Sequence, residues 1–141
     1  MYTPAGVPAG MHASLCLIGN PVIWWSGFVI MLGIGWTALT GKNKVAIFLA
    51  GLYFLQSLPW LLVTRTSFIY HYYPFLPLLI LGIAYAASQL NFDKWLPRIA
   101  LGTYLILVIT AFLLYFPLVT ATPVSETYIE SLRLFDTWSV L

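Results

Sequence analysis

The segment RTSFIYHYYP, which begins at Arg65, gathers side chains that could bind an anion within ten residues. Arg65 carries a fixed positive charge, and its planar guanidinium can grip two oxygens of a phosphate at once. His71 could bind the same phosphate or carry a proton. Three aromatic hydroxyl residues surround it: Tyr70, Tyr72 and Tyr73. The segment therefore predicts a phosphate-binding site.

Simpler roles are open for the same residues. Arg65 could reach lipid headgroups, or pair with an acidic side chain such as Glu126 or Glu130. His71 could donate a hydrogen bond to a neighbouring carbonyl. The tyrosines, like Trp24 and Trp25, fit the belt of amphipathic rings at a membrane interface. The residue types alone do not choose between these roles.

The composition favours a chain that lies in a membrane. Of its 141 residues, 61% are hydrophobic and only 7% are charged, and the mean hydropathy is +0.92. Soluble domains carry about 25% charged residues, so too few are present here to cover a water-exposed surface. A net charge of +2 gives no reason to expect a nucleic-acid partner.

Four apolar stretches approach the length of about 20 residues that a membrane-spanning helix needs. Pro21 suits the first position of the first helix, and Asn20 before it can act as the N-cap. Pro59 is expected to kink the second helix. The sequence thus predicts an all-α polytopic membrane protein. Its parts are an outer segment (1–20), a membrane domain (21–120) with helices at about 21–40, 45–63, 74–90 and 99–119, and an amphipathic tail (121–141).

The basic residues predict the orientation of these helices. Four of the six lie in the two short loops on one side: Lys42, Lys44, Lys94 and Arg98. Because positive loops favour the cytoplasm, we expect RTSFIYHYYP and both termini on the outer side. The first ten residues, MYTPAGVPAG, do not resemble a signal peptide. We therefore expect this chain to be the tail of a longer polytopic protein.

Motifs for other chemistry are missing from the sequence. It contains no Gly-rich phosphate loop, nucleophile elbow or general base in a recognisable setting. One cysteine and two separated histidines cannot form a tetrahedral metal site. We expect no metal and no cofactor.

Three motifs, in this order along the chain, resemble the C-terminal four-helix region of the protein O-mannosyltransferase family. They are LIGNPVIWW from Leu17 to Trp25, the segment RTSFIYHYYP, and a tail with Tyr128, Leu132, Phe135 and Trp138. The resemblance covers nearly the whole chain from about residue 12. The helix start GNPxxWW is its most specific part, because aromatic belts alone do not predict it.

The resemblance implies a membrane glycosyltransferase of the GT-C class that uses a dolichyl or polyprenyl phosphate carrier. Such an enzyme moves mannose to Ser or Thr of secreted proteins at the outer face of a bacterial plasma membrane or in the lumen of the endoplasmic reticulum. Arg65 would face the phosphate, His71, Tyr70 and Tyr73 would line its site, and Asn20, Trp24 and Trp25 would frame the same outer cavity. These seven residues are the binding residues that the resemblance implies.

The family's catalytic acids belong to the N-terminal half, so the resemblance implies no catalytic residue in this chain. We expect it to be inactive alone and to work with such a half, as a fragment or as one part of a split enzyme. Two alternatives remain: a small non-enzymatic protein that assembles with other membrane proteins, and a related enzyme that transfers another sugar.

Overall fold

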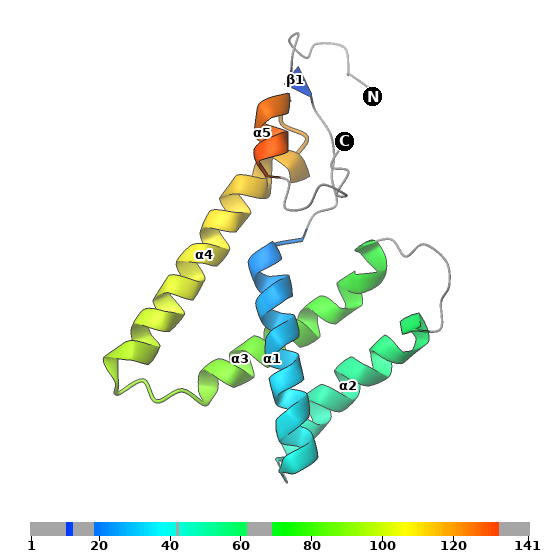
Figure 1. The fold of residues 1–141 in the computed structure, drawn as a ribbon, viewed down its shortest axis with the longest axis vertical. Helices are drawn as coiled ribbons and strands as arrows, with labels where there is room; N and C mark the ends of the chain where they lie inside the picture. Colours follow the sequence, from blue (N-terminus) through cyan, green and yellow to red (C-terminus); the bar gives the residue numbers. More distant parts are fainter. Residues whose placement is uncertain (1–10, 13–18, 42, 62–68, 133–141) are drawn as a thin grey trace. The chain divides into compact units, whose positions relative to one another are not determined.

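The computed structural model describes residues 11–12, 19–41, 43–61 and 69–132, and every structural statement below concerns these residues. They form helices with one short pair of strands (Figure 1). In chain order the elements are β1 (Met11–His12), α1 (Pro21–Thr40), α2 (Lys44–Leu61), the 3-10 helix η1 (Ile69–Phe75), α3 (Leu76–Ser88), α4 (Trp95–Val119), β2 (Val124–Ser125) and α5 (Glu126–Ser131). The predicted all-α class is confirmed.

Two of the described helices, α1 and α4, are long and apolar enough to cross a membrane. Two shorter apolar helical stretches lie between them in the sequence, Lys44–Trp60 and Tyr72–Ser88. Long hydrophobic side chains remain exposed along all four helices, including Leu39, Leu55, Leu81 and Ile106. Such exposure is unfavourable in water and favourable in lipid, which agrees with the membrane assignment.

The ends of the helices follow from local capping chemistry. α1 has the predicted bounds, whereas α2 begins at Lys44 because the Asn43 carboxamide oxygen accepts hydrogen bonds from the amides of Val45 and Ala46, at 3.0 and 3.2 Å. α4 begins at Trp95 rather than at the expected Ile99. Pro97 is compatible with this earlier start, since amides in the first helical turn need no partner within the helix.

The second half of RTSFIYHYYP forms η1 and leads directly into α3. Pro74 lies inside this 3-10 helix, and Pro77 lies in the first turn of α3. Because proline cannot donate a backbone hydrogen bond, the two prolines fit a tight 3-10 turn followed by a new α-helix. The predicted third helix, 74–90, is therefore an α-helix only from Leu76 to Ser88.

The chain divides into two units, and one of them is Pro21–Leu107. In it, α1 packs against both α2 and α3, and α1 crosses α3 (Figure 1). The start of α2 is tied to the end of α3 because the Asn43 amide nitrogen donates to the Tyr85 hydroxyl at 2.6 Å. Small and aliphatic side chains fill the core of this unit: Met31, Ile34, Ala46, Leu49, Ala50 and Leu79.

The other unit is Met1–Asn20 with Val108–Leu141. The described part of the predicted tail folds back on α4, where Ile129 packs against Tyr115 and Leu118. Two tyrosine hydrogen bonds join α4 to the tail, one donated from α4 and the other donated from α5. Tyr115 donates its hydroxyl proton to the Leu132 carbonyl at 3.0 Å, and Tyr128 donates to the Leu114 carbonyl at 2.7 Å. The expected position of Phe135 on the same helical face lies outside the described residues.

Helices α1 and α3 approach each other closely at Gly27. A Cβ atom at this position would lie 2.9 Å from Cβ of Leu79, an atom fixed directly to the α3 backbone. Leu79 is 2% exposed, so its side chain has no free space to move into. Gly27 therefore lets the two helix backbones come together, as small residues do in membrane helix pairs.

We predict that Gly27→Ala destabilises the protein by about 1–3 kcal/mol, since overpacking forces backbone or rotamer shifts. Gly33→Ala is the matched control, because it changes the same residue type in α1 but its Cβ would meet nothing within 4 Å. Unfolding of both variants in detergent, followed by circular dichroism, measures the effect. Equal unfolding midpoints for the two variants would contradict the assigned contact.

Candidate functional site

A cavity of about 450 Å³ lies in the Pro21–Leu107 unit, and most of its lining is aromatic. We call it the aromatic cavity. Its walls come from α1 (Trp24, Trp25, Phe28), from α2 (Tyr53, Ser57, Trp60), from η1 (Tyr72, Phe75) and from α3 (Leu79). Its volume lies within the range of sites for small molecules, about 300–1,000 Å³.

The spacing of these residues explains why they meet in one place. Trp24 and Phe28 are four residues apart, so they share one face of α1. Tyr53, Ser57 and Trp60 follow the same helical spacing on α2. In a 3-10 helix, residues three apart lie directly above one another, which puts Tyr72 and Phe75 on one face of η1. Helices α1, α2 and η1 thus each place one row of side chains along the wall of the cavity.

Edge-to-face ring contacts join these elements. Trp24 and Tyr72 have centroids 6.5 Å apart with their planes at 80°, and Tyr53 and Phe75 have centroids 5.7 Å apart at 73°. Tyr72 and Phe75 lie 6.0 Å apart within η1. Each such pair stabilises by about 0.5–1.5 kcal/mol beyond its buried area. The rings therefore hold η1 against both α1 and α2.

The polar atoms of the aromatic cavity are few and uncharged. The Ser57 hydroxyl donates to the Tyr53 carbonyl at 2.8 Å, an ordinary bond within a helix. The indole nitrogen Nε1 of Trp24 is buried and has no hydrogen-bond partner among the described residues. None of the described residues that line the cavity is a lysine, arginine, aspartate or glutamate. The described part of its lining is thus suited to apolar and aromatic contacts.

The expected site residues fall into three groups. Trp24 and Trp25 line the aromatic cavity, and Tyr72 lies with them, while Tyr73 is half-buried and is not part of the lining. Tyr70 and His71 belong to η1, but their side chains lie outside what the structure describes, as does all of Arg65. The binding role expected of these residues stays a prediction.

Asn20 belongs to the unit that contains the second half of α4. Its amide nitrogen donates to the Val108 carbonyl at 2.8 Å, so this side chain links the residue before α1 to α4. The structure thus gives Asn20 a bond that the expected helix-capping role did not include. Its expected place beside Trp24 and Trp25 at a shared cavity stays a prediction.

Sequence reasoning missed the contribution of α2. Tyr53, Ser57 and Trp60 stand at i, i+4 and i+7 in an apolar helix, a pattern that identifies one face of a helix without telling what it meets. Phe75 was also missed, because it lies just beyond RTSFIYHYYP. The 3-10 spacing from Tyr72 to Phe75 becomes visible only once η1 is known.

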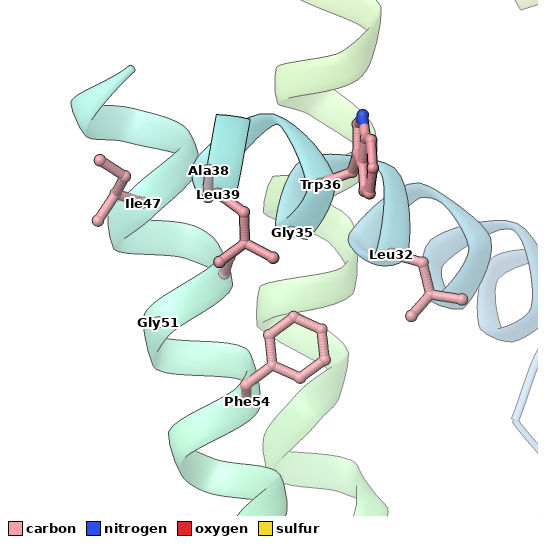
Figure 2. Close-up of a pocket in the computed structure, with 9 residues that line it drawn as sticks. Leu32, Gly35, Trp36, Ala38, Leu39, Ile47, Gly51 and Phe54 are labelled. Carbon is pink, nitrogen blue, oxygen red and sulfur yellow. The ribbon is translucent and has the colours of Figure 1, made fainter. Parts of the chain in front are cut away.

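A second cavity, of about 480 Å³, lies between the C-terminal half of α1 and the first half of α2 (Figure 2). In Figure 2 the Phe54 ring extends from α2 toward α1 near Gly35, where a Cβ atom would lie only 3.0 Å from the ring. Its lining residues are Leu32, Gly35, Trp36, Ala38, Leu39, Ile47, Ala50, Gly51 and Phe54. This surface offers apolar packing and no titratable group.

Among the described residues, no three His, Cys, Asp or Glu side chains lie close enough together to hold a metal ion.

Comparison with known proteins identifies the family. The family described as the C-terminal four TMM region of protein-O-mannosyltransferase matches residues 9–138. This chain belongs to that family. The match covers α1 to α5, including the aromatic cavity, and it bears out the resemblance carried by LIGNPVIWW and RTSFIYHYYP.

Individual relatives agree with this assignment. The chain is 27% identical, over 132 residues, to polyprenol-phosphate-mannose--protein mannosyltransferase of Mycobacterium tuberculosis (strain ATCC 25618 / H37Rv), covering 84% of this chain and 25% of the relative. It is 26% identical, over 130 residues, to the protein of the same name from Corynebacterium glutamicum, covering 86% of this chain and 25% of the relative. The chain thus spans about a quarter of the length of these relatives. No solved structure matches it significantly.

Phe75 is the central ring of the aromatic cavity, being 4% exposed and in contact with both Tyr53 and Tyr72. We predict that Phe75→Ala lowers the free energy of unfolding by about 3–5 kcal/mol. It should also reduce the near-ultraviolet circular dichroism of the packed tyrosines and tryptophans.

Phe48→Ala in α2 provides the control, since Phe48 is 63% exposed. We expect this variant to change the unfolding midpoint much less and to keep the near-ultraviolet spectrum. If Phe75→Ala left both the midpoint and the spectrum unchanged, the ring contacts would not hold η1 in place.

Proposed function

We propose that this chain forms the C-terminal membrane part of a glycosyltransferase that moves mannose from a polyprenyl phosphate carrier to Ser or Thr hydroxyls of proteins. The observation that carries the proposal is the family match across residues 9–138. The names of the relatives indicate polyprenol-phosphate-mannose as the donor and a protein as the acceptor. Because the chain spans a quarter of those relatives, the activity belongs to the complete enzyme rather than to this region alone.

Within that enzyme, we assign this region to donor binding. Transfer to a hydroxyl needs a base that removes the hydroxyl proton. The lining of the aromatic cavity offers hydroxyl, phenol and indole groups, none of which is a base at neutral pH. The region can hold and orient the carrier lipid, while the carboxylate that the family resemblance implies would come from the rest of the enzyme.

Arg65 is our candidate for the phosphate-binding cation, with His71, Tyr70 and Tyr73 beside it. Tyr72 follows Arg65 in the same segment and reaches the aromatic cavity with Trp24 and Trp25. The described residues that line the aromatic cavity carry no charge with which to neutralise a phosphate. An arginine supplied by this neighbouring segment would provide that charge, and the guanidinium fork suits phosphate oxygens.

We predict that Arg65→Ala, made in the complete enzyme that carries this region, lowers kcat/KM for polyprenyl-phosphate-mannose by about 10- to 100-fold. This range corresponds to the loss of one hydrogen bond to a charged group, about 1.5–3 kcal/mol. Arg65→Lys should recover part of the activity, because it keeps the charge and loses the fork. Mannose transfer to an acceptor peptide is the measurement.

Arg98→Ala is the matched control. Arg98 is exposed in the first turn of α4, and its Nε atom donates to the Phe92 carbonyl. It lies at the end of α4 that is expected on the opposite side of the membrane. If Arg65→Ala kept the wild-type kcat/KM, or if Arg98→Ala lost as much activity, the assignment of the phosphate to Arg65 would be wrong.

The same proposal places the RTSFIYHYYP segment and the C-terminal tail on the outer or lumenal side. Cysteine labelling tests this orientation in a background with Cys16→Ser, which removes the native thiol. Asp93→Cys and Thr127→Cys change two exposed residues on opposite sides. We expect a membrane-impermeant maleimide to label Thr127→Cys in intact cells and Asp93→Cys only after permeabilisation. The reverse pattern would invert the topology.

A further inference from the structure

The second cavity lies between one face of α1 and one face of α2 (Figure 2). On α2, the lining residues Ile47, Gly51 and Phe54 follow the spacing i, i+4 and i+7, so they share one helix face. On α1, Leu32 and Leu39 stand two helical turns apart and also share a face. Leu39 is 86% exposed. The cavity is therefore a depression between two helices that is open to the surroundings of this region.

Gly51 leaves the α2 backbone accessible in this cavity. A Cβ atom at Gly51 would meet nothing within 4 Å, whereas one at Gly35, on the α1 side, would lie 3.0 Å from the Phe54 ring. A contact within the chain thus accounts for Gly35 but not for Gly51. A glycine inside a helix costs up to about 1 kcal/mol relative to alanine. In membrane proteins, a small residue of this kind lets the backbone of a neighbouring helix come close.

Aromatic side chains supply contact area beside this glycine. Trp36 projects from α1 and Phe54 from α2 (Figure 2), and both line the cavity. Trp36 is 69% exposed and Phe54 is 41% exposed. Tryptophan is among the residues that contribute most to binding at protein interfaces. The cavity thus combines a close approach at Gly51 with large rings that a partner could cover.

The size of the relatives favours the rest of the same enzyme as the occupant. The family match is described as a C-terminal region, and the chain spans about a quarter of the length of its relatives. Most of an enzyme like these relatives therefore lies outside this chain. A segment that packs against α1 and α2 within the membrane must be helical, because only a helix satisfies its own backbone there. A lipid chain also suits apolar walls, but its fit does not depend on a missing Cβ.

We propose that the second cavity docks an apolar membrane-spanning helix from the N-terminal part of the same enzyme, and that this helix passes over Gly51. The inference rests on the proposed function, since it takes the complete enzyme to contain such a part. The docked helix covers Trp36 and Phe54. The cavity then joins this region to the part of the enzyme from which the catalytic carboxylate is expected.

Gly51→Leu tests the docking because it fills the space above the α2 backbone. The complete enzyme carrying this region is placed in lipid nanodiscs, and its thermal unfolding midpoint is measured. We expect Gly51→Leu to lower the midpoint by about 2–5 °C, since leucine would overpack the contact with the docked helix. Gly33→Leu is the matched control: a Cβ at Gly33 also meets nothing within 4 Å, and Gly33 does not line the cavity. This control should keep or raise the midpoint, because leucine favours a helix more than glycine does.

A site-specific photo-crosslinker identifies the occupant. An amino acid with a diazirine side chain replaces Leu39, which lines the cavity, or Phe48, which is 63% exposed and does not line it. The complete enzyme is irradiated in nanodiscs, and its adducts are mapped by mass spectrometry. We expect the probe at Leu39 to link to one apolar segment in the N-terminal part of the same polypeptide. The probe at Phe48 should form this link in much lower yield.

Three results would overturn the inference. Gly51→Leu could leave the midpoint as high as Gly33→Leu does, which would mean that no helix approaches Gly51 closely. The probe at Leu39 could link only to lipid, which would make the cavity a lipid-filled surface. It could also link only to a second copy of the enzyme, which would make the cavity an interface between copies. Mannose transfer by the wild-type enzyme is assayed in parallel, and its absence would refute the proposed function whatever the crosslinks show.

Discussion

The contact between Gly27 of α1 and Leu79 of α3 sets the geometry on which the aromatic cavity depends. With no Cβ at position 27, the α1 backbone comes close to the buried Leu79 side chain. Leu79 also forms part of the cavity wall, opposite the rings that α1 contributes before and after Gly27, at Trp24 and Phe28. This close helix contact thus contributes both to the core of the unit and to the wall of the cavity.

The lipid solvent explains why such a site can be built from so few polar atoms. In a membrane, helix faces need not be covered by charge, and the backbone satisfies its own hydrogen bonds within each helix. Aromatic rings can then serve for packing and for ligand recognition together. A charge within the cavity would be costly, so it is consistent that the expected cation, Arg65, comes from the segment that leads into η1.

The sequence predicted the helices well because long apolar stretches have few other possible structures. The bounds of α1 followed directly from Pro21 at its start. The start of α4 was expected at Ile99 but lies at Trp95, and Pro97 is compatible with this earlier start because a proline fits the first turn of a helix. The N-terminal cap of α2 at Asn43 and the 3-10 helix η1 were not predicted. Both depend on local backbone conformations that many different sequences can adopt.

The site was predictable only in part. Hydropathy and motif order led to Trp24, Trp25 and the RTSFIYHYYP segment, yet no pattern in the sequence says which faces of two helices meet. The positions of Tyr53 and Trp60 on α2, and the choice of Tyr72 rather than Tyr73 as a wall of the cavity, follow from tertiary packing. The missing partner of Trp24 Nε1 likewise becomes visible only when its burial is known.

The central proposal is that this region binds the lipid-linked donor beside the residues of α1 and η1 that line the aromatic cavity. Its most direct test is photo-crosslinking with a polyprenyl-phosphate-mannose that carries a diazirine on the sugar, followed by mass spectrometry of the labelled enzyme. The account predicts adducts on the peptides that contain Trp24 to Phe28 and Tyr72 to Phe75, competed away by unmodified donor. Competed adducts only outside these two peptides, for example on α5 or elsewhere in the enzyme, would contradict it.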